Sequence, residues 1–142
     1  IFCELIDEQS WREAWRVLRA LRPDILLDDL LAKREILISQ GYRLFGIRDS
    51  EKLVSVAGVV SSPHLTRGTD LWIHDMATLP ESQSHGFGTL LIQEIEKLAE
   101  QTGNSRVMVH SRIDRPDAHR FYETRAEFDK YAYVFSKELR AR

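Results

Sequence analysis

Two glycines in the stretch Gln83-Ser84-His85-Gly86-Phe87-Gly88 stand where a β-type run gives way to a helical pattern. The first turn of a helix carries unpaired backbone N–H groups and the positive end of the helix dipole, so this point suits an anion. Glycine lets the backbone approach a phosphate closely and adopt a positive φ. Further hydrogen-bond donors around the same point are Gln83, Ser84, His85 and Thr89. The pattern predicts either an anion-binding loop or an ordinary strand-to-helix turn, since glycines suit both.

The residues after the glycines exclude two common phosphate-binding loops. A P-loop requires Gly-Lys-Ser/Thr, whereas the sequence continues Gly88-Thr89-Leu90. A dinucleotide-binding fingerprint requires a third glycine, and that position holds Leu91. The pattern that remains is Gln/Arg-x-x-Gly-x-Gly/Ala.

The elements around this loop follow from the periodicity of apolar residues. The run Leu71–Thr78 before it is β-type, and Leu91, Ile95 and Leu98 after it share one helical face that ends before Gly103. Three elements are expected next: a strand at Arg106–Ser111, a helix at Asp117–Arg125 and a strand at Tyr131–Lys137. A strand–helix–strand crossover implies a parallel pair of strands in the sheet.

The first half of the chain predicts helices followed by a hairpin. Ser10 and Glu13 fit a capping box at the start of an amphipathic helix that ends before Pro23. The other expected elements are a strand at Ile1–Ile6, a helix at Asp28–Gln40 capped by Asp28 or Asp29, and an antiparallel hairpin of Tyr42–Arg48 with Leu53–Ser61. No linker or repeat divides the chain, so residues 1–142 are expected to form a single domain of mixed α and β structure.

The composition narrows the class of protein. The chain is 43% hydrophobic and 30% charged with a net charge of -2, and it has no basic stripe, so nucleic acid is not an expected partner. No apolar stretch approaches the ~20 residues that a membrane span needs, and the expected location is the cytoplasm. His74, His110 and His119 lack metal-ligand spacing, and no metal site is predicted.

Two motifs in order resemble those of a known family, the GNAT N-acetyltransferase superfamily. Gln83-x-x-Gly86-x-Gly88, after a strand that ends Met76-Ala77-Thr78-Leu79-Pro80, resembles the coenzyme A motif of that family. Ala118-x-x-Phe121-Tyr122 resembles a second family motif, and Tyr133–Leu139 resembles the last strand of many bacterial members. The resemblance covers roughly residues 40 to 139. It implies a mixed, mostly antiparallel sheet of about six to seven strands, with strands four and five parallel and about four flanking helices.

The resemblance also implies acetyl-CoA as the acyl donor and no metal. In the family, backbone groups of the strand before the loop pair with the pantetheine arm and the acetyl carbonyl, and the loop amides hold the pyrophosphate. The cofactor-binding residues implied here are Met76, Ala77, Thr78, Gln83, Ser84, His85, Gly86, Phe87, Gly88 and Thr89.

The implied reaction is direct transfer of the acetyl group to a primary amine of a small molecule or protein. Tyr122 matches the tyrosine that serves many members as general acid to the leaving thiolate. The base is open between His110, Asp75 and bulk water, because the position matched to the glutamate that some members use holds Trp72. Strand alternation places His74 and Asp75 on opposite faces.

Departures from the family pattern keep a second function open. Ser84 stands where many members have glycine, and Arg115 replaces an asparagine of the second motif. The alternative is a coenzyme-A-binding sensor or interaction module that has the fold but lacks transfer. A homodimer is common in the family, although no residue of this sequence argues for one.

Overall fold

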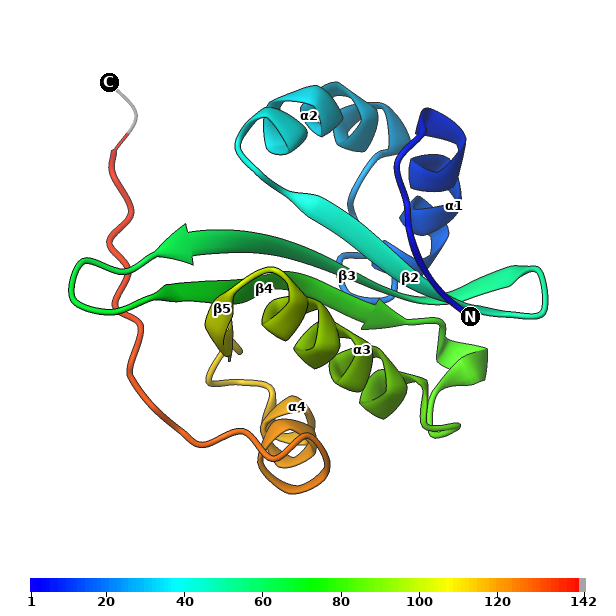
Figure 1. The fold of residues 1–142 in the computed structure, drawn as a ribbon. Coiled ribbons are helices and arrows are strands. Elements are labelled where there is room, and N and C mark those ends of the chain that lie inside the picture. Colours follow the sequence, from blue (N-terminus) through cyan, green and yellow to red (C-terminus); the bar gives the residue numbers. More distant parts are fainter. Residues whose placement is uncertain (141–142) are drawn as a thin grey trace. The chain divides into compact units, whose positions relative to one another are not determined.

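The computed structural model describes residues 1–140, which fall into two compact units, Ile1–Val109 and a smaller unit that begins at His110. The first unit contains a five-stranded sheet in the order β1-β2-β3-β4-β5 (Figure 1). Its strands are β1 (Phe2–Glu4), β2 (Arg43–Asp49), β3 (Lys52–Pro63), β4 (Thr69–Thr78) and β5 (Asn104–Val109). Its helices are α1 (Glu8–Leu18), α2 (Leu27–Ser39) and α3 (Phe87–Gln101). No helix among residues 1–140 is both long and apolar enough to cross a membrane.

The topology of the sheet confirms the expected hairpin and the expected parallel pair. β1 to β4 pair antiparallel in sequence order, and β5 then pairs parallel with β4 after the crossover through α3. α1 and α2 cover one face of the sheet and α3 covers the other (Figure 1). The core forms on both faces, with Trp11 and Val17 from α1 and Leu91 and Ile95 from α3 all buried.

A partly buried ion pair joins the two parallel strands. Asp70 on β4 lies opposite Arg106 on β5, and both carboxylate oxygens accept hydrogen bonds from the guanidinium at 3.0 and 2.8 Å. Hydrogen bonds from Arg106 lower the pKa of Asp70, whose side chain is only 4% exposed. Because the two partners meet only when β4 and β5 are aligned in this way, the pair specifies the parallel register.

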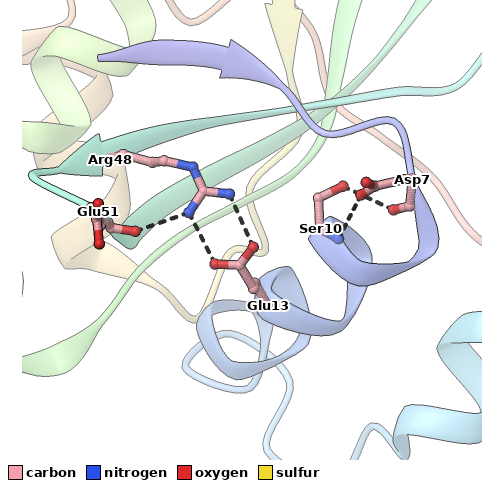
Figure 2. Close-up of polar contacts among 5 residues, drawn as sticks. All are labelled: Asp7, Ser10, Glu13, Arg48 and Glu51. Carbon is pink, nitrogen blue, oxygen red and sulfur yellow. Dashed lines mark hydrogen bonds and ion pairs between the residues drawn. The ribbon is translucent and has the colours of Figure 1, made fainter.

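The predicted capping box is wrong, because α1 begins three residues earlier than expected. Asp7 is the N-cap residue, and its side chain accepts a hydrogen bond from the Ser10 amide at 2.8 Å (Figure 2). Glu13 instead receives two hydrogen bonds from Arg48 on β2, at 2.9 and 3.0 Å, which lower the pKa of its carboxyl group (Figure 2). Asp7 and Ser10 are both suited to the N-cap position and lie three residues apart. The periodicity of the apolar residues does not show which of them begins the helix.

The smaller unit contains the expected helix but not the expected last strand. α4 (Pro116–Arg120) continues directly into a π-helical turn, Phe121–Arg125. Residues 127–140 form no helix or strand, so the described chain has five strands rather than the expected six to seven. A run of β-forming side chains becomes a strand only when another backbone pairs with it along its length, and Tyr131–Lys137 forms no strand among residues 1–140.

Candidate active site

The loop between β4 and α3 has the backbone conformation that the glycine pattern predicts. Gly86 is the N-cap residue of α3, and its φ of 82° lies in the left-handed region that favours glycine. Ser84 takes a similar φ of 68°. A non-glycine residue occupies this region at a cost in free energy, so the structure around Ser84 must hold it there.

The start of α3 presents a row of backbone amides with no hydrogen-bond partner in the described part of the chain. No side chain caps the helix, and its first turn contains no acidic residue. Among the hydrogen bonds of residues 1–140, none is donated by the backbone amides of Ser84 through Thr89. The nearest carboxylate in the sequence, Glu81, is paired with Lys52 at 3.1 Å. This arrangement can therefore receive an anion from outside the chain.

Two of the predicted donor side chains brace the loop. The Gln83 amide nitrogen donates to the backbone carbonyl of Thr78 at 3.2 Å, which ties the loop to the end of β4. His85 Nδ1 lies 3.1 Å from the carbonyl oxygen of Ser82 and must carry the proton to bond there. The side chains of Gln83 and His85 thus fix the loop, which leaves the backbone amides as the groups able to receive an anion.

The backbone of Met76, Ala77 and Thr78 lies on a part of β4 that has only one neighbouring strand. These residues pair with Ala57, Val56 and Ser55 of β3. Pairing of β4 with β5 covers Thr69–Ile73 and stops at the partners Ile73 and Val109. From His74 to Thr78, the edge of β4 that faces away from β3 has no strand partner in the described chain. An extended group can pair with this edge next to the loop.

A β-bulge in β4 sets the directions of His74 and Asp75. Gly58 lies opposite Asp75 and Val59 lies opposite Ile73, which leaves His74 as the extra residue. His74 is exposed, whereas Asp75 is half-buried. The bulge therefore determines that Asp75 is the half-buried residue of the two and His74 the exposed one. Strand alternation alone predicts only that the two side chains lie on opposite faces.

Asp75 belongs to a hydrogen-bonded cluster that the sequence did not reveal. The Tyr42 hydroxyl donates to Asp75 Oδ2 at 2.9 Å, and an Arg22 nitrogen donates to Oδ1 at 3.3 Å. Burial and the Asp75 charge raise the pKa of Tyr42, which keeps its hydroxyl protonated as the donor. Gly58 makes room for this contact, because a Cβ there would lie 1.6 Å from the Tyr42 hydroxyl oxygen.

Tyr122 and His110 belong to the smaller unit. Tyr122 lies on the π-helical turn, where Phe121 and Phe128 pack edge-on at ring-centroid distances of 5.4 and 5.6 Å. Burial raises the pKa of Tyr122, and the charge of Arg115 partly opposes this. His110 is exposed at the beginning of the unit. Across residues 1–140, no group of three or more His, Cys, Asp or Glu side chains is placed to hold a metal ion.

The structure thus brings together the loop, the open part of the β4 edge and Asp75 within the first unit. The members of the Asp75 cluster come from three separate segments: Tyr42 before β2, Gly58 in β3 and Arg22 after α1. No short motif connects these segments. Only the glycine at position 58, inside a strand, signalled a close approach of another group.

Comparison with known proteins agrees with the fold. "Uncharacterized N-acetyltransferase YhdJ" from Bacillus subtilis strain 168 is 27% identical over 137 residues, 96% of each chain. The structure of a putative acetyltransferase from Agrobacterium tumefaciens C58 matches with a TM-score of 0.84 at 19% identity, over 98% of this chain and 99% of that one. The structure of aminoglycoside N-acetyltransferase AAC(6')-Iy in complex with CoA matches with a TM-score of 0.81 at 15% identity, over 99% and 96%. The model of the acetyltransferase (GNAT) family matches residues 8–128, so the chain belongs to that family.

Proposed function

We propose that the protein transfers the acetyl group of acetyl-CoA directly to a primary amine. The observation that carries this proposal is the row of unused amides at the start of α3, directly beside the open part of the β4 edge. Together they offer one place for the pyrophosphate and an adjoining place for an extended arm. The family match spans residues from both units, which supports treating the chain as one functional domain.

Each group of the donor has residues of matching chemistry. The amides of Ser84 through Thr89 would hold the pyrophosphate, and the backbone of Met76, Ala77 and Thr78 would pair with the pantetheine arm. When bound, acetyl-CoA supplies a thioester whose carbonyl carbon accepts a nucleophile. The residues of the chain would hold this thioester carbonyl in the one orientation in which the amine can reach its carbon.

The reaction moves two protons. The amine nitrogen forms a bond to the acetyl carbon and loses a proton, while the bond from carbon to sulfur breaks and the thiolate gains one. Tyr122 is the proposed donor to sulfur, since its raised pKa keeps the phenol protonated at neutral pH. Asp75, His110 or water is the proposed acceptor of the amine proton. Asp75 already accepts hydrogen bonds from Tyr42 and Arg22, so an amine would share this carboxylate with them.

Release of free thiol from acetyl-CoA, measured across a panel of amines, tests the function. The panel needs simple monoamines, diamines, an aminoglycoside and peptides with a free N-terminus. We expect amine-dependent thiol release, with a matching acetylated amine detected by mass spectrometry. Coenzyme A binding without turnover on any amine would support the binding module instead.

Gly86→Ala is expected to weaken coenzyme A binding roughly fivefold, because alanine at a φ of 82° costs on the order of 1 kcal/mol and shifts the loop out of its amide-presenting form. Gly103 is a matched control at the other end of α3. It has a φ of 78°, and neither glycine has an atom within 4 Å of an added Cβ. Calorimetric titration should therefore show unchanged coenzyme A affinity for Gly103→Ala, although both variants lose similar stability. Equal affinities of the two variants would remove the loop from the binding site.

A further inference from the structure

The ion pair between Arg22 and Asp75 is looser than three other arginine–carboxylate pairs that join separate elements. In those pairs the guanidinium donates to both carboxylate oxygens at 2.8 to 3.1 Å: Arg43 with Glu4, Arg48 with Glu13 and Arg106 with Asp70. Arg22 donates one hydrogen bond to Asp75, at 3.3 Å, and its side chain is 59% exposed. A single long contact at the surface contributes little to stability, so this pair can be broken easily.

The two oxygens of the Asp75 carboxylate have different surroundings. Oδ2 accepts a hydrogen bond from the Tyr42 hydroxyl at 2.9 Å, and Tyr42 is only 6% exposed. Oδ1 contacts the exposed Arg22 side chain instead. The Asp75 side chain is 22% exposed, so part of it remains in contact with solvent. Oδ1 is therefore the oxygen that a group from outside the chain can reach, and a shielded carboxylate favours a positively charged partner there.

The backbone around Arg22 is held independently of this ion pair. The Arg22 amide donates to the Leu18 carbonyl at 2.9 Å, and the Arg22 carbonyl accepts from the Ile25 amide at 3.2 Å. The Trp15 indole N–H also donates to the Ile25 carbonyl at 3.0 Å. Loss of the contact with Asp75 therefore frees the Arg22 side chain and leaves the connection between α1 and α2 in place.

We propose that Arg22 is an internal cation that the acceptor displaces: a positively charged group of the acceptor replaces its guanidinium at Asp75 Oδ1. This inference rests on the proposed acetyl transfer, because Asp75 directly precedes Met76, the first residue of the segment proposed for the pantetheine arm. The proposed pyrophosphate loop follows the other end of that segment, Thr78, so an arm along it would bring the thioester toward Asp75. Arg22 thus determines specificity by competition, since a cation compensates the carboxylate that the guanidinium leaves.

Binding of n-butylammonium tests the displacement without any acetyl transfer. In Arg22→Gln the competing charge is absent, so we expect the dissociation constant of n-butylammonium to fall about two- to fivefold, as for the loss of an exposed ion pair. Arg22→Lys keeps a cation and should bind as the native chain does. The Tyr42 ring resonances, followed by NMR at constant ionic strength, report occupancy beside Asp75. An unchanged or higher dissociation constant in Arg22→Gln would overturn the proposal.

Two controls separate competition at Asp75 from a general change in charge. Arg19→Gln removes the same charge on a guanidinium that stacks on the Trp15 ring at 4.8 Å, and it should leave the dissociation constant unchanged. The double variant Arg22→Gln/Asp75→Asn lacks the carboxylate and should show no saturable binding. If it bound n-butylammonium as tightly as Arg22→Gln alone, the amine would occupy another place and the proposal would fail.

Steady-state kinetics extends the test to the reaction and distinguishes this inference from the proposed function. For the best amine of the panel, Arg22→Gln should lower KM and leave kcat within about twofold of the native value. A raised KM for an amino acid acceptor would contradict displacement, because Arg22 would then bind the acceptor's carboxylate. If n-butylammonium binding depends on Arg22 as expected but no amine releases thiol, acetyl transfer is refuted and the competition at Asp75 stands.

Discussion

Gly58→Ala is expected to lower the free energy of unfolding by about 3 kcal/mol and to separate Tyr42 from Asp75. An added Cβ would lie 1.6 Å from the Tyr42 hydroxyl oxygen and 2.1 Å from the ring carbon that bears it. The ring has little room to move, because Tyr42 is only 6% exposed and packs against Trp11 at a centroid distance of 5.9 Å. The alanine therefore forces either the ring or β3 out of place.

Two further variants separate this clash from a general effect of removing glycine. Gly41 has a φ of 88° and open space around an added Cβ, so Gly41→Ala should cost only about 1 kcal/mol through its backbone conformation. In a Tyr42→Val background the clashing atoms are gone, and Gly58→Ala should then cost less than about 1 kcal/mol. Urea unfolding of the four combinations measures the coupling. A cost for Gly58→Ala that does not depend on residue 42 would show that the two residues do not share this space.

The same variant should also affect the reaction if Asp75 positions or deprotonates the amine. Loss of the Tyr42 hydrogen bond leaves Arg22 as the remaining partner of the carboxylate, through an exposed contact of 3.3 Å. We expect this change to raise KM for the amine while the affinity for coenzyme A stays the same, because no hydrogen bond among the described residues joins the loop amides to the cluster. A parallel loss of coenzyme A binding would indicate general unfolding instead.

The loop and its flanking elements could be predicted from the sequence because each is encoded locally. Gly86 and Gly103 mark the two ends of α3, and the change from period two to period 3.6 places β4 before it. The parallel pairing of β4 with β5 follows from the crossover. These features need no knowledge of distant contacts.

The Asp75 cluster and the state of the C-terminal segment could not be predicted in this way. Tyr42 and Asp75 are 33 residues apart, and their contact depends on the bulge at His74 and on the missing side chain of Gly58. Tyr131–Lys137 has strand-forming residues, but propensity does not supply the second backbone that a strand requires. The cluster depends on contact between residues distant in sequence, and the C-terminal segment depends on a second backbone that its own residues do not specify.

Tyr122→Phe is expected to lower kcat by about 100-fold or more while KM for acetyl-CoA and the affinity for coenzyme A remain unchanged. Phenylalanine keeps the edge-on packing with Phe121 and Phe128, so the fold of the π-helical turn should be retained. Only the hydroxyl that would protonate the leaving thiolate is removed. Stopped-flow measurement of thiol release under saturating amine isolates this step.

The pH dependence gives an independent check on the same role. Burial raises the pKa of Tyr122 above its ordinary value of 10.0, and an acid works while it holds its proton. Tyr122 therefore contributes no loss of rate as pH rises through the neutral range, and its deprotonation would lower kcat only above about pH 10. Any rise in rate between pH 6 and 9 must come from the amine or its base, and it should persist in Tyr122→Phe at the lower rate. Tyr133→Phe, at a side chain that is 89% exposed, is the matched control and should keep the native rate. If Tyr122→Phe kept the native rate as well, the proton for the thiolate would have to come from water or from another residue.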